Sequence, residues 1–236
     1  MPLGACRAGL MSVAADDIPD SEDLHAYYDA TELNLSDDDS VSTWTEETGN
    51  ENDLTQETSD NQPTFKTEII NGNSVIRHDG DSDFLITAFQ STLQQALDVF
   101  IVAQKRSVGT DDRQRLFASD TAGEVEYFCG NDSEGNNWAI DAGERLDSTT
   151  NEDTDPHIFH VKLNGTESIM RLDGSQIASG DVGTNNLAGL TTAARASGDV
   201  EHGDFDHGEI LLYPDRTTSQ IESVESYLAD KWGITI

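Results

Sequence analysis

Short runs of strand-forming residues, interrupted by Gly, Asn, Asp and Ser at intervals of about ten residues, constrain the fold of this chain more than any other feature. This spacing is typical of antiparallel sandwiches and jelly rolls. No internal repeat and no shift in composition divides the 236 residues, and one large β-sandwich can have this length. We therefore expect a single all-β domain over residues 21–236. Residues 1–20 show no clear period and are predicted to be an N-terminal arm or docking segment.

Several strands can be placed individually. Asp98–Ala103 reads DVFIVA and predicts a central strand buried on both faces. Phe159–Leu163 alternates between apolar and polar residues, which indicates a strand with one solvated face. Asp173 and Gly174 form a dipeptide that favours a hairpin turn. Val125–Cys129 and Trp138–Asp141 are predicted to form another antiparallel pair.

One α-helix is predicted, at the C-terminal end. Thr217 with Gln220, or Ser219 with Glu222, can form a capping box at its start, and Gly233 stands where a C-terminal cap belongs. An amphipathic stripe of this kind usually faces a core, so we expect the helix to close the sandwich. The stripe recurs at three- and four-residue steps and consists of Ile221, Val224, Tyr227, Leu228 and Trp232.

The charge of the chain is strongly negative. Asp and Glu number 46 against 13 Lys and Arg, which gives a formal net charge of -33, and only four of the basic residues are lysines. At about 1 M salt the Debye length falls to about 3 Å, so the repulsion that opposes a compact state is largely screened. Acidic residues spread along the whole chain therefore predict a protein adapted to high salt, of the haloarchaeal kind. A calcium-loaded acidic protein is the alternative.

The same composition excludes several classes of partner. A nucleic-acid-binding protein needs a basic surface, which this chain lacks, and anionic membrane surfaces would repel it. No apolar run approaches the length of a membrane span. Two cysteines, Cys6 and Cys129, cannot make a disulfide framework. Whether they form one bridge or remain two free thiols stays open.

Motifs at both ends of the chain carry a resemblance to a known family. The C-terminal segment Asp206–Ile234 and the N-terminal segments Tyr28–Ala30, Val41–Trp44 and Thr48–Asn50 resemble the closing and opening elements of concanavalin A-like (LamG-like) jelly rolls of phage and microbial surface proteins. The hairpin Ile169–Gly180 fits the same pattern. The C-terminal positions that match are Gly208, Glu209, Tyr213, Asp215, Arg216, Tyr227, Leu228, Lys231, Trp232 and Gly233.

The resemblance implies an antiparallel two-sheet sandwich with a short C-terminal helix, and binding more often than catalysis. Because a fold does not fix a function, the residues must be weighed separately. For carbohydrate, the candidate binding residues are Asn136, Asn137 and Trp138, where an aromatic ring stands beside two amides. Trp138 can either stack on a sugar ring or belong to the core.

Two groups of acidic residues are candidates for a functional site, one for metal binding and one for catalysis. Asp79, Asp81 and Asp83 alternate after a strand and could supply oxygen ligands to calcium, the one metal predicted here, although a solvated acidic loop is the alternative. No other cofactor is expected. A retaining polysaccharide-cleaving enzyme needs paired carboxylates on one face, a spacing shown by Asp204, Asp206 and Glu209. With 46 acids such matches arise by chance, and we predict a protein that is not an enzyme.

The leading functional hypothesis is a virion-surface or extracellular cell-surface protein of a halophilic archaeal system. It would decorate a capsid, or form a turret or fibre, and recognise host surface glycans through loops at one rim of the jelly roll. The arm of residues 1–20 would anchor it to neighbouring virion or surface proteins, and a homo-oligomer is expected. A purely structural decoration protein without ligand and a polysaccharide-cleaving enzyme are the alternatives.

Overall fold

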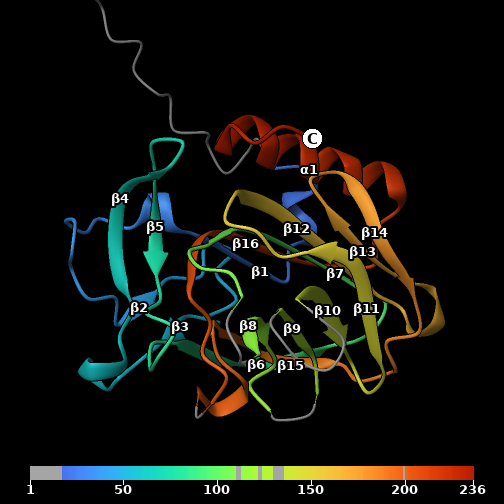
Figure 1. Ribbon diagram of the computed structural model, residues 1–236, viewed down its shortest axis with the longest axis horizontal. Coiled ribbons are helices and arrows are strands. Elements are labelled where there is room, and N and C mark those ends of the chain that lie inside the picture. Colours follow the sequence, from blue (N-terminus) through green and yellow to red (C-terminus); the bar gives the residue numbers. More distant parts are fainter. Residues whose placement is uncertain (1–17, 110–112, 122–123, 130–135, 199) are drawn as a thin grey trace, which may run out of the picture.

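Two antiparallel sheets stacked face to face form the body of the protein in the computed structural model, as predicted (Figure 1). The structure describes residues 18–109, 113–121, 124–129, 136–198 and 200–236. Sheet A runs in the order β14-β13-β12-β7-β16-β5-β4, and β1 pairs with β16 beside β5. Its strands are β1 (Ala26–Asp29), β4 (Thr64–Ile70), β5 (Asn73–Arg77), β7 (Leu97–Lys105), β12 (Pro156–Leu163), β13 (Ser168–Leu172), β14 (Ser175–Gly180) and β16 (Phe205–Pro214).

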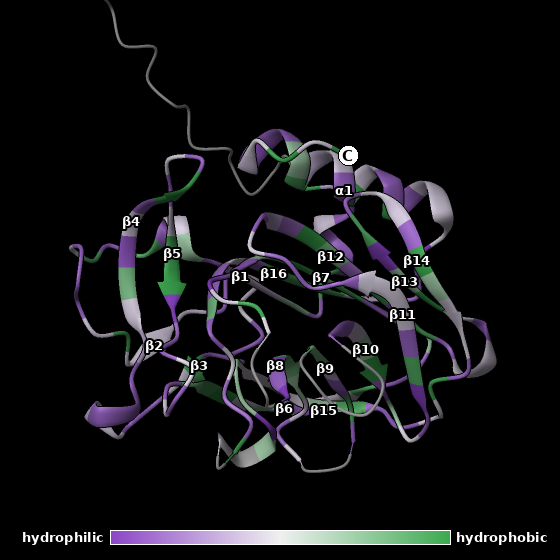
Figure 2. Cartoon of the chain, in the orientation of Figure 1, coloured by the Kyte–Doolittle hydropathy of each residue, from purple (hydrophilic) through white to green (hydrophobic). Residues whose placement is uncertain are grey.

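Sheet B lies on the other side of the core and runs in the order β11-β10-β9-β8-β15-β6-β3-β2. Figure 2 shows hydrophobic segments on the strands and mostly hydrophilic residues in the loops that join them. This pattern follows from burial of one face of each sheet against the other. The strands of sheet B are β2 (Thr43–Trp44), β3 (Leu54–Thr55), β6 (Leu85–Leu93), β8 (Gln114–Ala118), β9 (Glu126–Cys129), β10 (Asn137–Asp141), β11 (Arg145–Asn151) and β15 (Leu187–Thr192).

The α-helix of the described residues, α1 (Thr218–Trp232), covers the outer face of sheet A (Figure 1). Its predicted ends are confirmed. Thr217 and Gln220 form a reciprocal capping box, and Gly233 ends the helix with a φ of +64°, a conformation that favours glycine. Among the described residues no helix is long and apolar enough to cross a membrane.

Because α1 lies on sheet A, the central strands β7 and β16 are buried on both faces. The predicted central strand is confirmed, since β7 is buried at nearly every position. The prediction of a half-solvated strand around His160 is wrong. His160 is fully buried, and its Nε2 lies 2.8 Å from the carboxylate of Asp98 on the neighbouring β7. Alternation marks two different faces, but it cannot show that a helix covers the polar one.

The predicted N-terminal arm of residues 1–20 is described only from Ile18 onward. Ile18 is buried in the core beneath α1, and the carbonyl of Pro19 accepts a hydrogen bond from the Tyr213 hydroxyl at 2.8 Å. Asp20 accepts one from Gln220 at 2.7 Å. Residues 18–20 therefore pack on their own domain. Residues 1–17, with the cysteine at position 6, lie outside the described part, and Cys129 is a buried free thiol.

Candidate ligand-binding pocket beside strand β1

The residues that carry the resemblance at the two chain ends meet in one buried network between β1, β16 and α1. The carboxylate of Glu209 accepts hydrogen bonds from Trp232 Nε1 (2.5 Å) and from the Tyr227 hydroxyl (3.0 Å). Lys231 Nζ lies 2.8 Å from Glu209 and 2.5 Å from Asp29 on β1. Burial raises the pKa of Glu209 to about 7, although the Lys231 ammonium opposes this shift. The network fastens α1 to β1.

The three acids of the candidate catalytic motif are all held by neighbouring side chains, and Arg106 lies 2.5 Å from Asp204 and 3.7 Å from Asp206. Asp206 makes a bidentate pair with Arg77, with both N–O distances at 2.7 Å. Asp204 accepts a hydrogen bond from the Ser107 hydroxyl at 2.6 Å. Glu209 is fully buried in the network under α1. The arrangement is an Asp204–Asp206 pair bridged by Arg106, with Glu209 buried separately, rather than an exposed acid and nucleophile facing one substrate.

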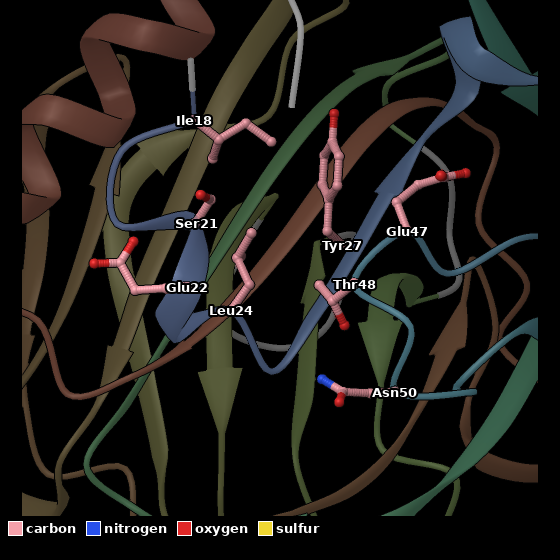
Figure 3. Close-up of a pocket in the computed structure, with 8 residues that line it drawn as sticks. All are labelled: Ile18, Ser21, Glu22, Leu24, Tyr27, Glu47, Thr48 and Asn50. Carbon is pink, nitrogen blue, oxygen red and sulfur yellow. The ribbon is translucent and has the colours of Figure 1, made fainter. Parts of the chain in front are cut away.

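A cavity of about 300 Å³ lies beside β1, directly next to this network (Figure 3). We call it the β1 pocket. Its lining combines three apolar or aromatic side chains with five that carry hydrogen-bonding groups, so it is more polar than most small-molecule sites. The lining residues are Ile18, Ser21, Glu22, Leu24, Tyr27, Glu47, Thr48 and Asn50.

One wall of the pocket is the turn after β2, and Glu46 holds it in place. The buried Glu46 carboxylate accepts backbone N–H groups from Tyr27 (3.1 Å), Thr48 (2.8 Å) and Asn50 (2.9 Å). Gly49 allows the turn because its φ of +83° is unfavourable for other residues. A single carboxylate thus joins the wall to β1, so the pocket is formed without a ligand.

The opposite wall is the segment that enters β1. Ile18 and Leu24 are buried in the core beneath α1, where they anchor its two ends. Between them, Arg216 Nη1 lies 3.2 Å from the carboxylate of Asp20 and 3.0 Å from that of Asp23. Arg216 is itself buried, so this wall is fixed to the end of β16.

Two lining residues differ from the rest in their electrostatics or hydrogen bonding. Partial burial and the nearby carboxylates of Glu32 and Asp29, among others, raise the pKa of the exposed Glu47 above its ordinary value. The hydroxyl of Thr48 is buried and has no hydrogen-bond partner. Because solvent does not reach this oxygen, it belongs to the packed wall of the pocket and not to its accessible surface.

A second hollow, of about 570 Å³, lies at the rim of the sandwich among three loops, and we call it the rim groove. Gln95 holds these loops together. Its side-chain amide donates to the carbonyls of Gly183 (3.3 Å) and Asn185 (2.6 Å) and accepts the N–H of Gly165 (2.8 Å). Most of the lining side chains are amides or hydroxyls, and one is an acid: Gln95, Asn164, Gly165, Thr166, Glu167, Thr184 and Asn186.

The residues predicted to bind carbohydrate lie elsewhere. Trp138 is fully buried, with its ring centroid 4.7 Å from that of Phe159 and 6.2 Å from that of Tyr127. It is a core residue, and its ring is not available to stack on a sugar. Asn136 and Asn137 are partly exposed at the start of β10, but neither lines the β1 pocket or the rim groove.

The predicted calcium loop is bonded to itself. Asp79 Oδ1 accepts the backbone N–H groups of Asp81 (2.8 Å), Ser82 (2.9 Å) and Asp83 (3.0 Å). Burial alone would raise the pKa of Asp79, but these donors outweigh it, and the pKa lies below its ordinary value. Among the described residues no three acidic, histidine or cysteine side chains are grouped to hold a metal ion. Calcium binding by this loop stays a prediction.

Sequence reasoning missed the β1 pocket although it singled out one of its walls, the turn Thr48–Asn50. Tyr28 and Asp29 lie in the opening strand as expected, whereas Ala30 begins a short 3-10 helix. Nothing in their separate patterns predicts that Glu46 bonds across to Tyr27. The one signal in the sequence was the pair of successive glutamates at this turn, Glu46 and Glu47, of which Glu46 is buried.

Comparison with known proteins finds similarity in structure alone. No protein-family model matches the chain, and its sequence matches no curated protein. Trypanosoma rangeli sialidase in complex with sialic acid superposes with a TM-score of 0.61 at 9% identity, over 89% of this chain and 33% of the sialidase. The binding domain of Botulinum neurotoxin DC in complex with SialylT gives a TM-score of 0.61 at 9% identity, over 88% and 51% of the two chains.

An arabinofuranosidase complexed with arabinofuranosyl-alpha-1,2-xylobiose gives a TM-score of 0.59 at 14% identity, over 79% of this chain and 50% of the enzyme. This chain thus spans a third to a half of each of these proteins. Identities this low establish the shared fold, a β-sandwich, and no more.

Proposed function

We propose that this chain is a non-enzymatic carbohydrate-binding module of the concanavalin A-like class, and that the β1 pocket holds the sugar. The cavity beside β1 carries the proposal, because apolar side chains line it together with the exposed hydrogen-bonding side chains of Glu47 and Asn50. The structural neighbours support it, since all three are proteins solved with a bound sugar or sialylated ligand.

The proposed setting is an outer surface in molar salt, on a virion or a cell of a halophilic archaeal system. As capsid decoration, turret or fibre, the module would form a homo-oligomer and attach to neighbouring proteins through its N-terminal arm. The net charge of -33 supports the salt adaptation, because so many carboxylates repel one another in dilute buffer. The free energy of unfolding should therefore rise steadily from dilute buffer to molar salt, as measured by urea denaturation at each salt concentration. A flat response would contradict the adaptation.

Binding can be tested on a glycan array in molar salt. Asn50→Ala in the β1 pocket should weaken or abolish the signal, whereas Asn186→Ala in the rim groove should leave it unchanged. The two variants are matched, since each asparagine side chain makes one hydrogen bond to the main chain of a neighbouring segment. Loss of binding only in Asn186→Ala would move the site to the rim. No glycan binding at all would favour the purely structural role, and release of sugar products would favour the enzyme.

A further inference from the structure

We propose further that two copies of this chain associate through the rim of the sandwich where β6 ends and β15 begins. The inference rests on the homo-oligomer in the proposed function and gives it an interface. We call this surface the neutral rim, because the side chains that form it are exposed or half-buried and carry no charge. They are Ser91, Thr92, Gln94, Gln95, Thr184 and Asn186.

Charge is missing from two long stretches of the chain that lie side by side in the fold. Charged residues make up 25% of the sequence, yet residues 84–97 and 182–194 contain none, and these are its two longest uncharged runs. The strands within them, β6 and β15, are hydrogen-bonded neighbours in sheet B (Figure 1). The two runs therefore combine into one uncharged region of a protein whose net charge is -33.

Burial does not explain the absence of charge in β6. Ser91 and Thr92 are exposed, whereas β7 is buried at nearly every position and still carries Asp98 and Lys105. The pairing register explains the exposure, since β6 advances five residues between two paired positions where β15 advances two. The extra residues form a bulge, which carries side chains of β6 away from the ladder.

Gln95 joins the two uncharged segments at this end of the sheet. Its backbone N–H donates to the side-chain oxygen of Asn186 at 2.9 Å, and its side-chain amide donates to the carbonyl of Asn185 at 2.6 Å. The rim groove lies beside them and is lined by Gln95, Thr184 and Asn186 among others. The end of β6 and the start of β15 therefore present their amides and hydroxyls on one surface.

Three acids border the neutral rim without interrupting it. The carboxylate of Glu51 accepts a hydrogen bond from the Gln90 amide at 3.3 Å, and that of Glu167 accepts one from the Asn164 amide at 3.4 Å. Asp181 directly precedes the second uncharged run. The uncharged area thus has the extent of a contact surface and charged edges that keep it hydrated in the free protein.

A second copy of the chain is the partner that fits this surface. Copies of like charge repel each other, so contact between them costs least where charge is missing. In a two-fold dimer, side chains near the axis face their own counterparts. A carboxylate would then face a carboxylate, whereas an amide or a hydroxyl both donates and accepts and can bond to its counterpart. The neutral rim consists of such groups.

Sedimentation velocity in molar salt tests the interface at protein concentrations of about 1–100 µM, the affinity range of weak interfaces. We expect the sedimentation coefficient of the wild type to rise with concentration as dimers form. Thr184→Asp and, separately, Thr92→Asp place a carboxylate in the contact, and each should weaken dimerisation at least about tenfold. Thr58→Asp adds the same charge at an exposed position outside the neutral rim and should leave dimerisation unchanged.

The outcomes separate this interface from the proposed sugar binding. A wild type that stays monomeric, or a dimer that persists in both rim variants, would overturn the interface whatever the glycan array shows. Loss of glycan binding in Thr184→Asp would also overturn it, because the rim would then hold a neutral sugar. A dimer that binds no glycan would keep the interface and overturn the sugar-binding function. Thr184 lies in a loop, so thermal unfolding should show that its variant folds normally even if Thr92→Asp weakens β6.

Discussion

The β1 pocket and the rim groove are each held together by one side chain, which is charged in the first and neutral in the second. In each, one side chain bonds to the main chain at three places and so fixes the surrounding segments: Glu46 at the β1 pocket and Gln95 at the rim groove. Glu46 is a carboxylate that only accepts hydrogen bonds, whereas Gln95 is a neutral amide that donates and accepts. The comparison teaches that the acidic residues of this chain do more than hydrate its surface, since one of them organises a cavity.

The largest expected effect is that of Glu46→Ala. Three N–H groups would lose a charged acceptor, and we expect the free energy of unfolding to fall by about 3–5 kcal/mol. Urea denaturation in molar salt measures the loss, and sugar binding should disappear with it. Glu46→Gln keeps one acceptor oxygen and should lose markedly less.

The neutral counterpart, Gln95→Ala, should cost about 2–3 kcal/mol, because hydrogen bonds between uncharged groups are weaker. The exposed neighbour Gln94 provides the control, and Gln94→Ala should change stability by less than about 0.5 kcal/mol. If Gln95→Ala lowered the free energy of unfolding as much as Glu46→Ala does, the charge of Glu46 would not explain the difference between the β1 pocket and the rim groove.

The buried network beside the β1 pocket should also make the stability of the protein depend on pH, whereas the rim groove should not. The folded-state pKa of Glu209, about 7, lies above the ordinary value of 4.5, so the folded protein holds a proton that the unfolded chain releases. The contribution of Glu209 to the free energy of unfolding therefore falls as pH rises from 4.5 to 7, by on the order of 2 kcal/mol. Denaturation across this range should show the slope in the wild type and in Gln95→Ala, and lose that part of it in Glu209→Gln. An unchanged slope in Glu209→Gln would contradict the assignment.

The smallest effect on stability is expected for Thr48→Val. The threonine hydroxyl has no partner, so its removal should alter the free energy of unfolding by less than about 0.5 kcal/mol. Sugar affinity in the β1 pocket, measured by calorimetric titration, should also change little, because the buried hydroxyl does not face the cavity. Thr166→Val in the rim groove should leave that affinity unchanged, and a drop there would mean that the groove shares in binding.

Local signals in the sequence determined the strands, the C-terminal helix with its two caps, and the acidic character. The capping box at Thr217 and the cap at Gly233 act within a few residues of chain, and so does the Asp173-Gly174 turn; their outcome depends little on the rest of the protein. The two-sheet arrangement also followed, because regular alternation needs a second sheet to bury each apolar face.

Tertiary structure alone decided which faces are covered and which residues meet. Whether Trp138 stacks on a ligand or fills the core depends on the sheet opposite it, and His160 is buried only because α1 lies over β12. The β1 pocket depends on contacts between Glu46 and Tyr27, nineteen residues apart. Periodicity reports that a strand has two faces, but only packing between distant segments determines what each face touches, and a binding site is made of such contacts.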